Sequence, residues 1–215
     1  MERYRQQIFE LAFSGRLTAD FRTDGSIGSA MRNSLPASWR SVPLGKISEI
    51  QGGIQVGKKR PAGTELVEVP YLRVANVQRG WLKLDKIKTI QVSTEEKERL
   101  VLRDGDILMN EGGDRDKLGR GWIWEAQISE CIHQNHIFRI RLIDTDFPSK
   151  FVSHYANAMG QRYFFDEGTQ TTNSDILTTT RASCATRLSL FDEVMRPYHI
   201  FMPPSPFSLR PMALK

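Results

Sequence analysis

Long apolar runs, cysteines and secretion signals are scarce or absent in this sequence of 215 residues. No apolar run approaches the roughly 20 residues that a membrane-spanning helix needs, and the first residues contain no apolar segment typical of a secretory signal. The two cysteines, Cys131 and Cys184, do not have the spacing of a metal-binding pair. We therefore expect buried thiols in a cytoplasmic protein with no membrane partner.

Motifs that hold a cofactor or carry catalysis are also absent, among them GxxxxGK[ST], GxGxxG, HExxH, CxxC and GxSxG. His133 and His136 are spaced to diverge on a strand, which argues against a metal site. Glu95 and Lys97, downstream of Asp85, loosely resemble a metal-dependent nuclease core. They fall, however, in the first turns of an expected helix, where a carboxylate usually only interacts favourably with the helix dipole. The sequence thus predicts no catalytic residue, no metal and no cofactor in this chain.

What the sequence does have is an excess of positive charge, with 30 Lys and Arg against 25 Asp and Glu, a net charge of +5. Such a balance favours an anionic partner, of which nucleic acid is the commonest. The contents of apolar residues (40%) and charged residues (26%) are ordinary for a globular chain. A folded protein that binds nucleic acid is therefore the first hypothesis.

Apolar residues near the start of the chain recur at helical spacing. Tyr4, Ile8, Leu11 and Ala12 fall on one face of the predicted helix, and Gly15 is placed to end it. This face either packs on the chain's own core or binds a partner, as a dimerisation or spacer helix would.

Alternating patterns dominate after a Gly- and Ser-rich linker at residues 23–35. Apolar and polar residues alternate at 69–77, 81–90 and 136–142, which predicts half-buried antiparallel strands. The apolar stretch at 107–109 predicts a buried strand.

Two helices are expected among these strands. Ser93 and Glu96 form a capping-box pattern that opens a helix ending near Leu100, and Pro148 and Gly160 mark the start and end of another. Strands with inserted helices predict an α+β fold, a single globular domain with a twisted, largely antiparallel sheet.

Glycines and cations coincide in loops at 51–60, 78–80 and 105–121. Glycine lets a backbone approach a duplex closely, and Lys and Arg side chains reach phosphates. Asn and Gln side chains can pair with the edge of adenine. The alternative is that each loop is merely solvated. The candidate DNA-binding residues are Gln55, Lys58, Lys59, Arg60, Asn76, Asn110, Arg115, Lys117, Arg120, Gln134 and Asn135.

The order of several segments resembles a known family. "LPASWRSVPLGKISEIQGGIQVGKK", "VPYLRVANVQRGWLKLDKI", "LVLRDGDILMNEGG", "GR", "HQNHIFRIR" and "GTQTTN" follow one another as in a target recognition domain of a type I restriction–modification specificity subunit. The opening "RQQIFELAFSGRLTADFR" resembles the distal end of that subunit's spacer helix. The resemblance covers residues 1 to about 173.

The resemblance implies a DNA-reading protein without an active site. A whole specificity subunit has two recognition domains joined by two antiparallel spacer helices, and each domain reads half of a split DNA site. It recruits methyltransferase subunits, which methylate adenine with S-adenosylmethionine, and through them restriction subunits; ATP and Mg are likewise implied only for partner subunits. Another half-subunit is a further implied partner. The resemblance adds Arg73, Thr169 and Gln170 to the DNA-binding set, and makes Tyr4, Ile8, Leu11 and Ala12 a partner-helix face.

The expected organisation is a spacer-helix end at 1–22, the linker at 23–35, the recognition domain at 36–173 and an atypical tail at 174–215. The tail departs from the family, as an altered reading frame or a degenerate gene end would produce, and the chain corresponds to about half a subunit. Two alternatives stay open. One is a protein-interaction module, and the other is a recognition domain detached from a fused methyltransferase–nuclease.

Overall fold

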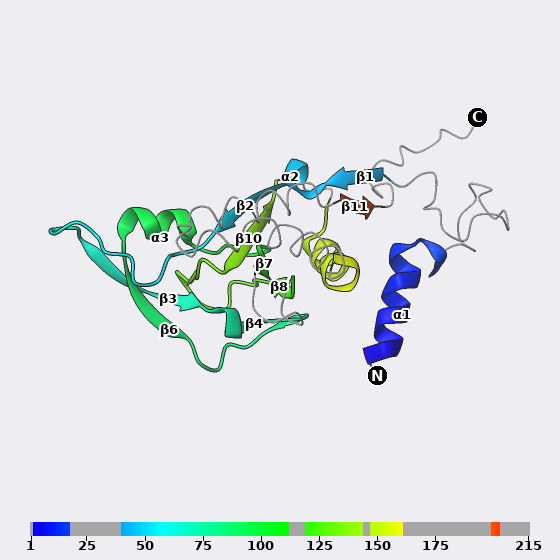
Figure 1. Ribbon diagram of the computed structural model, residues 1–215, viewed down its shortest axis with the longest axis horizontal. Helices are drawn as coiled ribbons and strands as arrows, with labels where there is room; N and C mark the ends of the chain where they lie inside the picture. The colour runs from blue at the N-terminus through cyan, green and yellow to red at the C-terminus, as the bar shows by residue number, and fades with distance from the viewer. Residues whose placement is uncertain (1, 18–39, 112–118, 144–146, 161–198, 203–215) are drawn as a thin grey trace, which may run out of the picture.

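The computed structural model of the chain combines short helices with strands that pair mostly antiparallel (Figure 1). The predicted α+β class is therefore confirmed. None of the helices within the described residues is both long and apolar enough to cross a membrane. The structure describes residues 2–17, 40–111, 119–143, 147–160 and 199–202.

The largest sheet has four antiparallel strands in the order β2-β10-β7-β8. Its strands are β2 (Ser48–Gly52), β10 (Ile137–Leu142), β7 (Ile107–Asn110) and β8 (Gly121–Ile123). The strands predicted at 107–109 and 136–142 are confirmed, but β10 is a central strand with both faces covered. Arg139, which the alternating pattern placed toward solvent, is only 4% exposed.

A second sheet has the order β6-β3-β9. It consists of β6 (Lys88–Ser93), β3 (Leu66–Leu72) and β9 (Ile132–His133), with β3 antiparallel to β6 and parallel to β9. Helix α3 (Thr94–Leu100) follows β6 directly. Its capping box is formed as predicted, because the Ser93 hydroxyl accepts the Glu96 N–H and the Glu96 carboxylate accepts the Ser93 N–H.

The predictions of uninterrupted strands at 69–77 and 81–90 were wrong, and Asn76 explains both. After β3 the chain forms a 3-10 turn, η2 (Val74–Asn76), in which the Asn76 Oδ1 atom accepts the Arg73 N–H. The same side chain donates to the Lys83 and Lys86 carbonyls, which holds residues 83–87 in an irregular, bent conformation between β5 and β6. What remains is a small hairpin of β4 (Val77–Gln78) and β5 (Trp81–Leu82).

Helix α1 (Glu2–Phe13) packs on the helix at 149–160, with Gly15 at φ 72° just beyond its end. The ring of Phe13 lies 5.1 Å from that of Tyr155, and Phe9 lies 5.2 Å from His154. Both helices were predicted, although Gly160 is itself helical and not the residue just beyond the helix end.

The predicted apolar stripe of α1 does not make this contact. Tyr4, Ile8 and Leu11 are 73%, 54% and 37% exposed, and Ala12 is half-buried. The residues that pack, Phe9 and Phe13, lie on a neighbouring face.

In the part of the chain that the structure describes, three clusters of buried side chains form the core. One joins the four-stranded sheet to α1, to α2 (Leu44–Ile47) and to the helix at 149–160. The second surrounds Trp124 and includes side chains of β7 and of the β4–β5 hairpin. The third joins the β6-β3-β9 sheet to α3 through Leu100. Figure 1 shows α3 and α1 at opposite ends of the molecule.

Part of the tail belongs to the fold. Strand β11 (His199–Met202) pairs antiparallel with β1 (Arg40–Pro43). The predicted atypical tail at 174–215 therefore contributes a strand, which its sequence did not predict. The division of the chain into four units stays a prediction.

Candidate nucleic-acid interface

The β2–β3 loop (residues 53–65) carries three of the five predicted DNA-binding cations that lie within the described residues. At its root the Ile54 N–H donates to the His133 carbonyl at 2.7 Å, and the Asn135 N–H donates to the Ile54 carbonyl at 2.9 Å. A Cβ atom on Gly53 would stand 2.0 Å from the His133 carbonyl oxygen, so only glycine permits this approach. The root places Gln55, which is exposed, close to the turn that follows β9.

The outer part of this loop projects from the sheet. Gly57 has φ 80°, a left-handed conformation that favours glycine, and the neighbouring side chains of Lys58 and Lys59 are exposed. On the returning arm the Thr64 hydroxyl donates to the Pro61 carbonyl at 2.9 Å and closes a turn. The loop thus presents two lysines on an ordered backbone.

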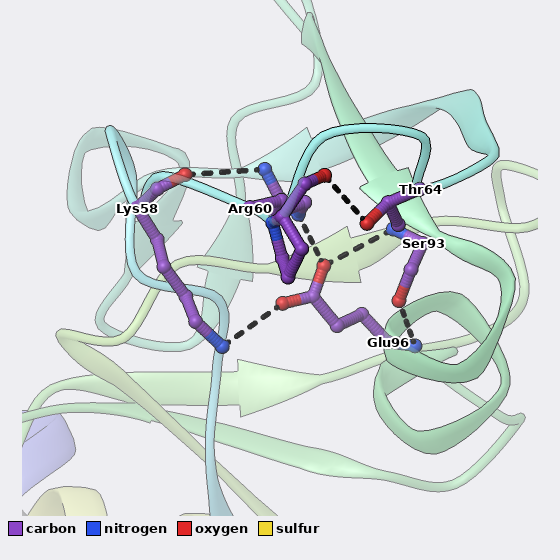
Figure 2. A network of polar contacts seen from close by, with 6 residues as sticks. Lys58, Arg60, Thr64, Ser93 and Glu96 are labelled. Carbon is purple, nitrogen blue, oxygen red and sulfur yellow. Dashed lines mark hydrogen bonds and ion pairs between the residues drawn. The ribbon is translucent and has the colours of Figure 1, made fainter.

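Glu96 connects this loop to α3 (Figure 2). Its Oε2 atom lies 2.7 Å from the Arg60 Nε atom, and its Oε1 atom lies 3.4 Å from the Lys58 Nζ atom. The side chains of Arg60 and Glu96 are 14% and 12% exposed, against 54% for Lys58. Burial raises the pKa of the Glu96 carboxyl, but hydrogen bonds from Arg60 and the Ser93 N–H outweigh it and hold that pKa below its ordinary value.

A second group of candidates gathers around the turn at Val74. The Asn110 amide donates to the Val77 carbonyl at 3.0 Å, and the guanidinium groups of Arg73 and Arg120 donate to the Lys86 and Val74 carbonyls. Asn76 and Asn110 are 3% and 0% exposed. The structure therefore gives these two amides an internal role in shaping the backbone.

The turn after β9 lies between the two groups. Gln134 is half-buried, and Asn135 is 6% exposed with its backbone bonded to Ile54. His136 contacts Glu111 at 3.2 Å, and Glu111 immediately follows β7. The remaining candidates lie outside the described residues: Arg115, Lys117, Thr169 and Gln170.

The side chains that most resemble catalytic or metal-binding groups are buried. Burial raises the pKa of the Cys131 thiol to about 12 and lowers the pKa of His133 to about 4. The His133 Nδ1 atom lies 2.9 Å from the Ile137 carbonyl, which can only accept, so Nδ1 carries the proton. Across the described ranges, no cluster of three or more His, Cys, Asp or Glu side chains could hold a metal ion.

Sequence reasoning missed two carboxylates that pair with arginine side chains, Glu96 and Asp106. The capping box marked Glu96 as a helix residue, but its partner Arg60 lies 36 positions earlier in the chain. Asp106 is 1% exposed and accepts two hydrogen bonds from the guanidinium group of Arg141, at 2.8 and 2.7 Å. The only local signal for Asp106 was an acidic residue directly before a buried strand.

Comparisons with known proteins agree with the motifs. The Type I restriction enzyme StySPI specificity subunit of Salmonella potsdam is 24% identical over 165 residues, covering 76% of this chain and 33% of that protein. The predicted resemblance to specificity subunits is thus confirmed, and the chain spans about a third of the length of this relative. No protein-family profile matches the chain.

Two solved structures are also similar. One, described as the structural basis underlying complex assembly and conformational transition of the type I R-M system, has a TM-score of 0.46 and 18% identity, covering 94% of this chain and 41% of that chain. The other is the HsdS subunit from Thermoanaerobacter tengcongensis, with a TM-score of 0.39 and 15% identity, covering 89% of this chain and 51% of that chain.

Proposed function

We propose that this chain recognises one half of a split site in double-stranded DNA, as a target recognition domain of a type I restriction–modification specificity subunit. The alignment with the StySPI specificity subunit carries the proposal. The exposed, glycine-flanked lysines of the β2–β3 loop support it, because cations on a loop that can approach a duplex are suited to phosphate contacts.

Within this function, the candidate residues divide by whether their side chains are exposed or already bonded within the fold. Lys58 and Lys59 are exposed and would contact phosphates, which positions the protein without choosing a sequence. Gln55 is exposed and Gln134 half-buried at the loop root, so these two amides are the candidates for base edges. Asn76 and Asn110 instead hold the backbone in shape.

The proposed partners follow from the same assignment. The exposed stripe of Tyr4, Ile8 and Leu11 on α1 would pack against a spacer helix of another specificity half-subunit. Methyltransferase subunits, and restriction subunits through them, would supply S-adenosylmethionine, ATP and Mg, so this chain would direct adenine methylation and cleavage in the cytoplasm without catalysing either.

The test is binding of the full chain to pooled random duplexes over a series of salt concentrations. We expect affinity to fall steeply with salt, and repeated selection to enrich one half-site. Gln55→Ala and Gln134→Ala should weaken that enrichment while leaving the salt slope nearly unchanged. Lys46→Gln removes an exposed cation on α2 and shows how far a change in net charge alone alters the salt slope. Salt-independent binding without enrichment would contradict the proposal.

The exposed stripe on α1 favours one second candidate, a protein-interaction module whose basic loop is merely solvated. The same experiment separates the two functions, since such a module would show no salt-dependent affinity for duplex DNA.

A further inference from the structure

We propose that Glu96 is a positioning residue that fixes the β2–β3 loop and limits how many of its cations reach DNA phosphates. The inference rests on the proposed function, because it concerns the same DNA-contacting loop. It assigns a different part to each of the three consecutive cations Lys58, Lys59 and Arg60.

The carboxylate is held in place from its own side first. Glu96 lies in the first turn of α3, where its Oε2 atom accepts the Ser93 N–H at 3.1 Å. The helix itself is anchored by Leu100, which is fully buried against the β6-β3-β9 sheet. A carboxylate fixed in this way loses little further side-chain entropy when it binds a cation, so it can hold a loop that comes from another part of the chain.

Arg60 is the cation that Glu96 uses to hold the loop. Its Nε atom bonds Glu96 at 2.7 Å, its Nη1 atom donates to the Lys58 carbonyl at 3.4 Å, and its Nη2 atom is buried. Figure 2 shows this guanidinium between the loop backbone and the helix. We assign Arg60 to loop positioning and no phosphate contact.

Lys58 and Lys59 differ from Arg60 and from each other. Lys58 is 54% exposed and lies 3.4 Å from Glu96, a surface ion pair of small net strength that a phosphate can replace. Lys59 is exposed and has no ion-pair or hydrogen-bond partner among the described residues. Lys59 would therefore contribute a whole phosphate contact and Lys58 only part of one.

The negative charge of Glu96 also opposes DNA directly. It lies next to both cationic side chains, well within the Debye length of about 10 Å at 0.1 M salt. Its presence therefore weakens attraction to any duplex, whatever the sequence. A protein that reads one site among many benefits from weak non-specific binding, because the useful quantity is the ratio of specific to non-specific affinity.

Glu96→Gln separates the charge from the helix cap. Glutamine can still accept the Ser93 N–H in a capping box, but it no longer neutralises Lys58 or repels phosphates. With the full chain and random-sequence duplex DNA, we expect the slope of log affinity against log salt to steepen, by less than the roughly 0.9 of one whole phosphate contact, because Lys58 already makes part of that contact in the wild type. If the two proteins bind equally at 1 M salt, Glu96→Gln should then bind up to about eightfold more tightly than the wild type at 0.1 M. Glu98→Gln, an exposed residue of the same helix, makes the same change in net charge and should change the slope much less.

Two further variants leave Glu96 and the helix intact. Lys59→Gln should flatten the slope by about 0.9 and Lys58→Gln by clearly less, because Glu96 already neutralises part of Lys58. In the Glu96→Gln background, Lys58→Gln should remove the larger part of the gain in affinity and leave only the part that comes from direct repulsion, which a general loosening of the loop would not predict.

Several outcomes would overturn the inference while leaving the proposed function intact: equal slopes for Glu96→Gln and the wild-type chain, equal losses from Lys58→Gln and Lys59→Gln, or a gain in Glu96→Gln that persists undiminished without Lys58. If the wild-type chain itself shows no salt-dependent DNA binding, the proposed function fails first, and the inference fails with it.

Discussion

Within the described residues, two networks in which a carboxylate binds arginine differ in burial. In the four-stranded sheet Asp106 is 1% exposed, binds the Arg141 guanidinium at two points and accepts the Arg103 N–H at 2.7 Å. At the edge of the second sheet Glu96 is 12% exposed and shares its oxygens between Arg60 and the more exposed Lys58. The first network stabilises the interior, whereas the second leaves a cation that another anion can take over.

Removing the carboxylate of the buried network should have the largest effect. Asp106→Asn leaves the Arg141 guanidinium partly buried without its counter-ion, which we expect to lower the free energy of unfolding by about 3 kcal/mol. Urea unfolding of the full chain measures the change. Asp104→Asn, at an exposed position two residues earlier, should stay close to the wild type. If both variants unfold at the same urea concentration, the ion pair of Asp106 with Arg141 does not stabilise the interior as its burial implies.

Acid should lower the stability of the folded chain through the buried side chain of His133. The backbone carbonyl of this residue accepts the Ile54 N–H at the root of the β2–β3 loop. The pKa of this side chain is about 4 in the folded chain, below its ordinary value of 6.5. Between these two pH values the unfolded chain binds a proton that the folded chain does not, so stability is lost as pH falls from 6.5 to 4. The slope is about 1.4 kcal/mol per pH unit and the total loss is on the order of 3 kcal/mol.

Unfolding midpoints measured across this pH range check the prediction. His133→Gln has no group to titrate at this position, so its stability should depend less on pH than that of the wild type. Burial also lowers the pKa of His154, which adds a smaller loss in the same direction in both proteins. A slope unchanged by His133→Gln would show that His133 is not the group responsible.

Two glycines of the β2–β3 loop test where the interior ends and the exposed loop begins. Gly53→Ala would place a Cβ atom against the His133 carbonyl, and we expect a loss of about 2 kcal/mol in stability. Gly57→Ala meets no atom within 4 Å, and only its φ of 80° opposes the substitution, which should cost about 1 kcal/mol. Equal effects in thermal or urea unfolding would contradict the close approach at Gly53.

Local patterns in the sequence were sufficient where a feature depends on neighbouring residues. Ser93 and Glu96 predicted the start of α3, and the apolar run at 107–109 predicted β7, since capping and burial of a short strand are legible within a few positions. The exposed basic loop at 53–60 was also located correctly, whereas the turn after β9 was not, because residues 133–136 were expected to run into a strand.

Features that depend on distant residues could not be predicted in this way. Asn76 interrupts two expected strands, because its side chain donates to the Lys83 and Lys86 carbonyls. An asparagine in an alternating pattern gives no sign of these distant contacts. Arg139 lies on a central strand, and its burial depends on which strands pair with β10. Base readout and phosphate contacts by the candidate residues stay predictions.

The smallest expected effect on stability concerns the serine that shares the exposed network with Glu96. Ser93→Ala removes the hydroxyl that accepts the Glu96 N–H at 3.2 Å, and loss of such an N-cap costs about 1 kcal/mol. The charge of Glu96 and its partner Arg60 remain, so the salt dependence of DNA binding should stay that of the wild type. Glu96→Gln should instead steepen the salt slope, and because it removes the counter-ion of Arg60, whose side chain is 14% exposed, it should also lower stability by more than Ser93→Ala does. Ser93→Thr, which keeps a hydroxyl, should restore most of the lost stability. If Ser93→Ala changes the salt slope as much as Glu96→Gln does, the helix cap rather than the carboxylate charge controls how the loop meets DNA.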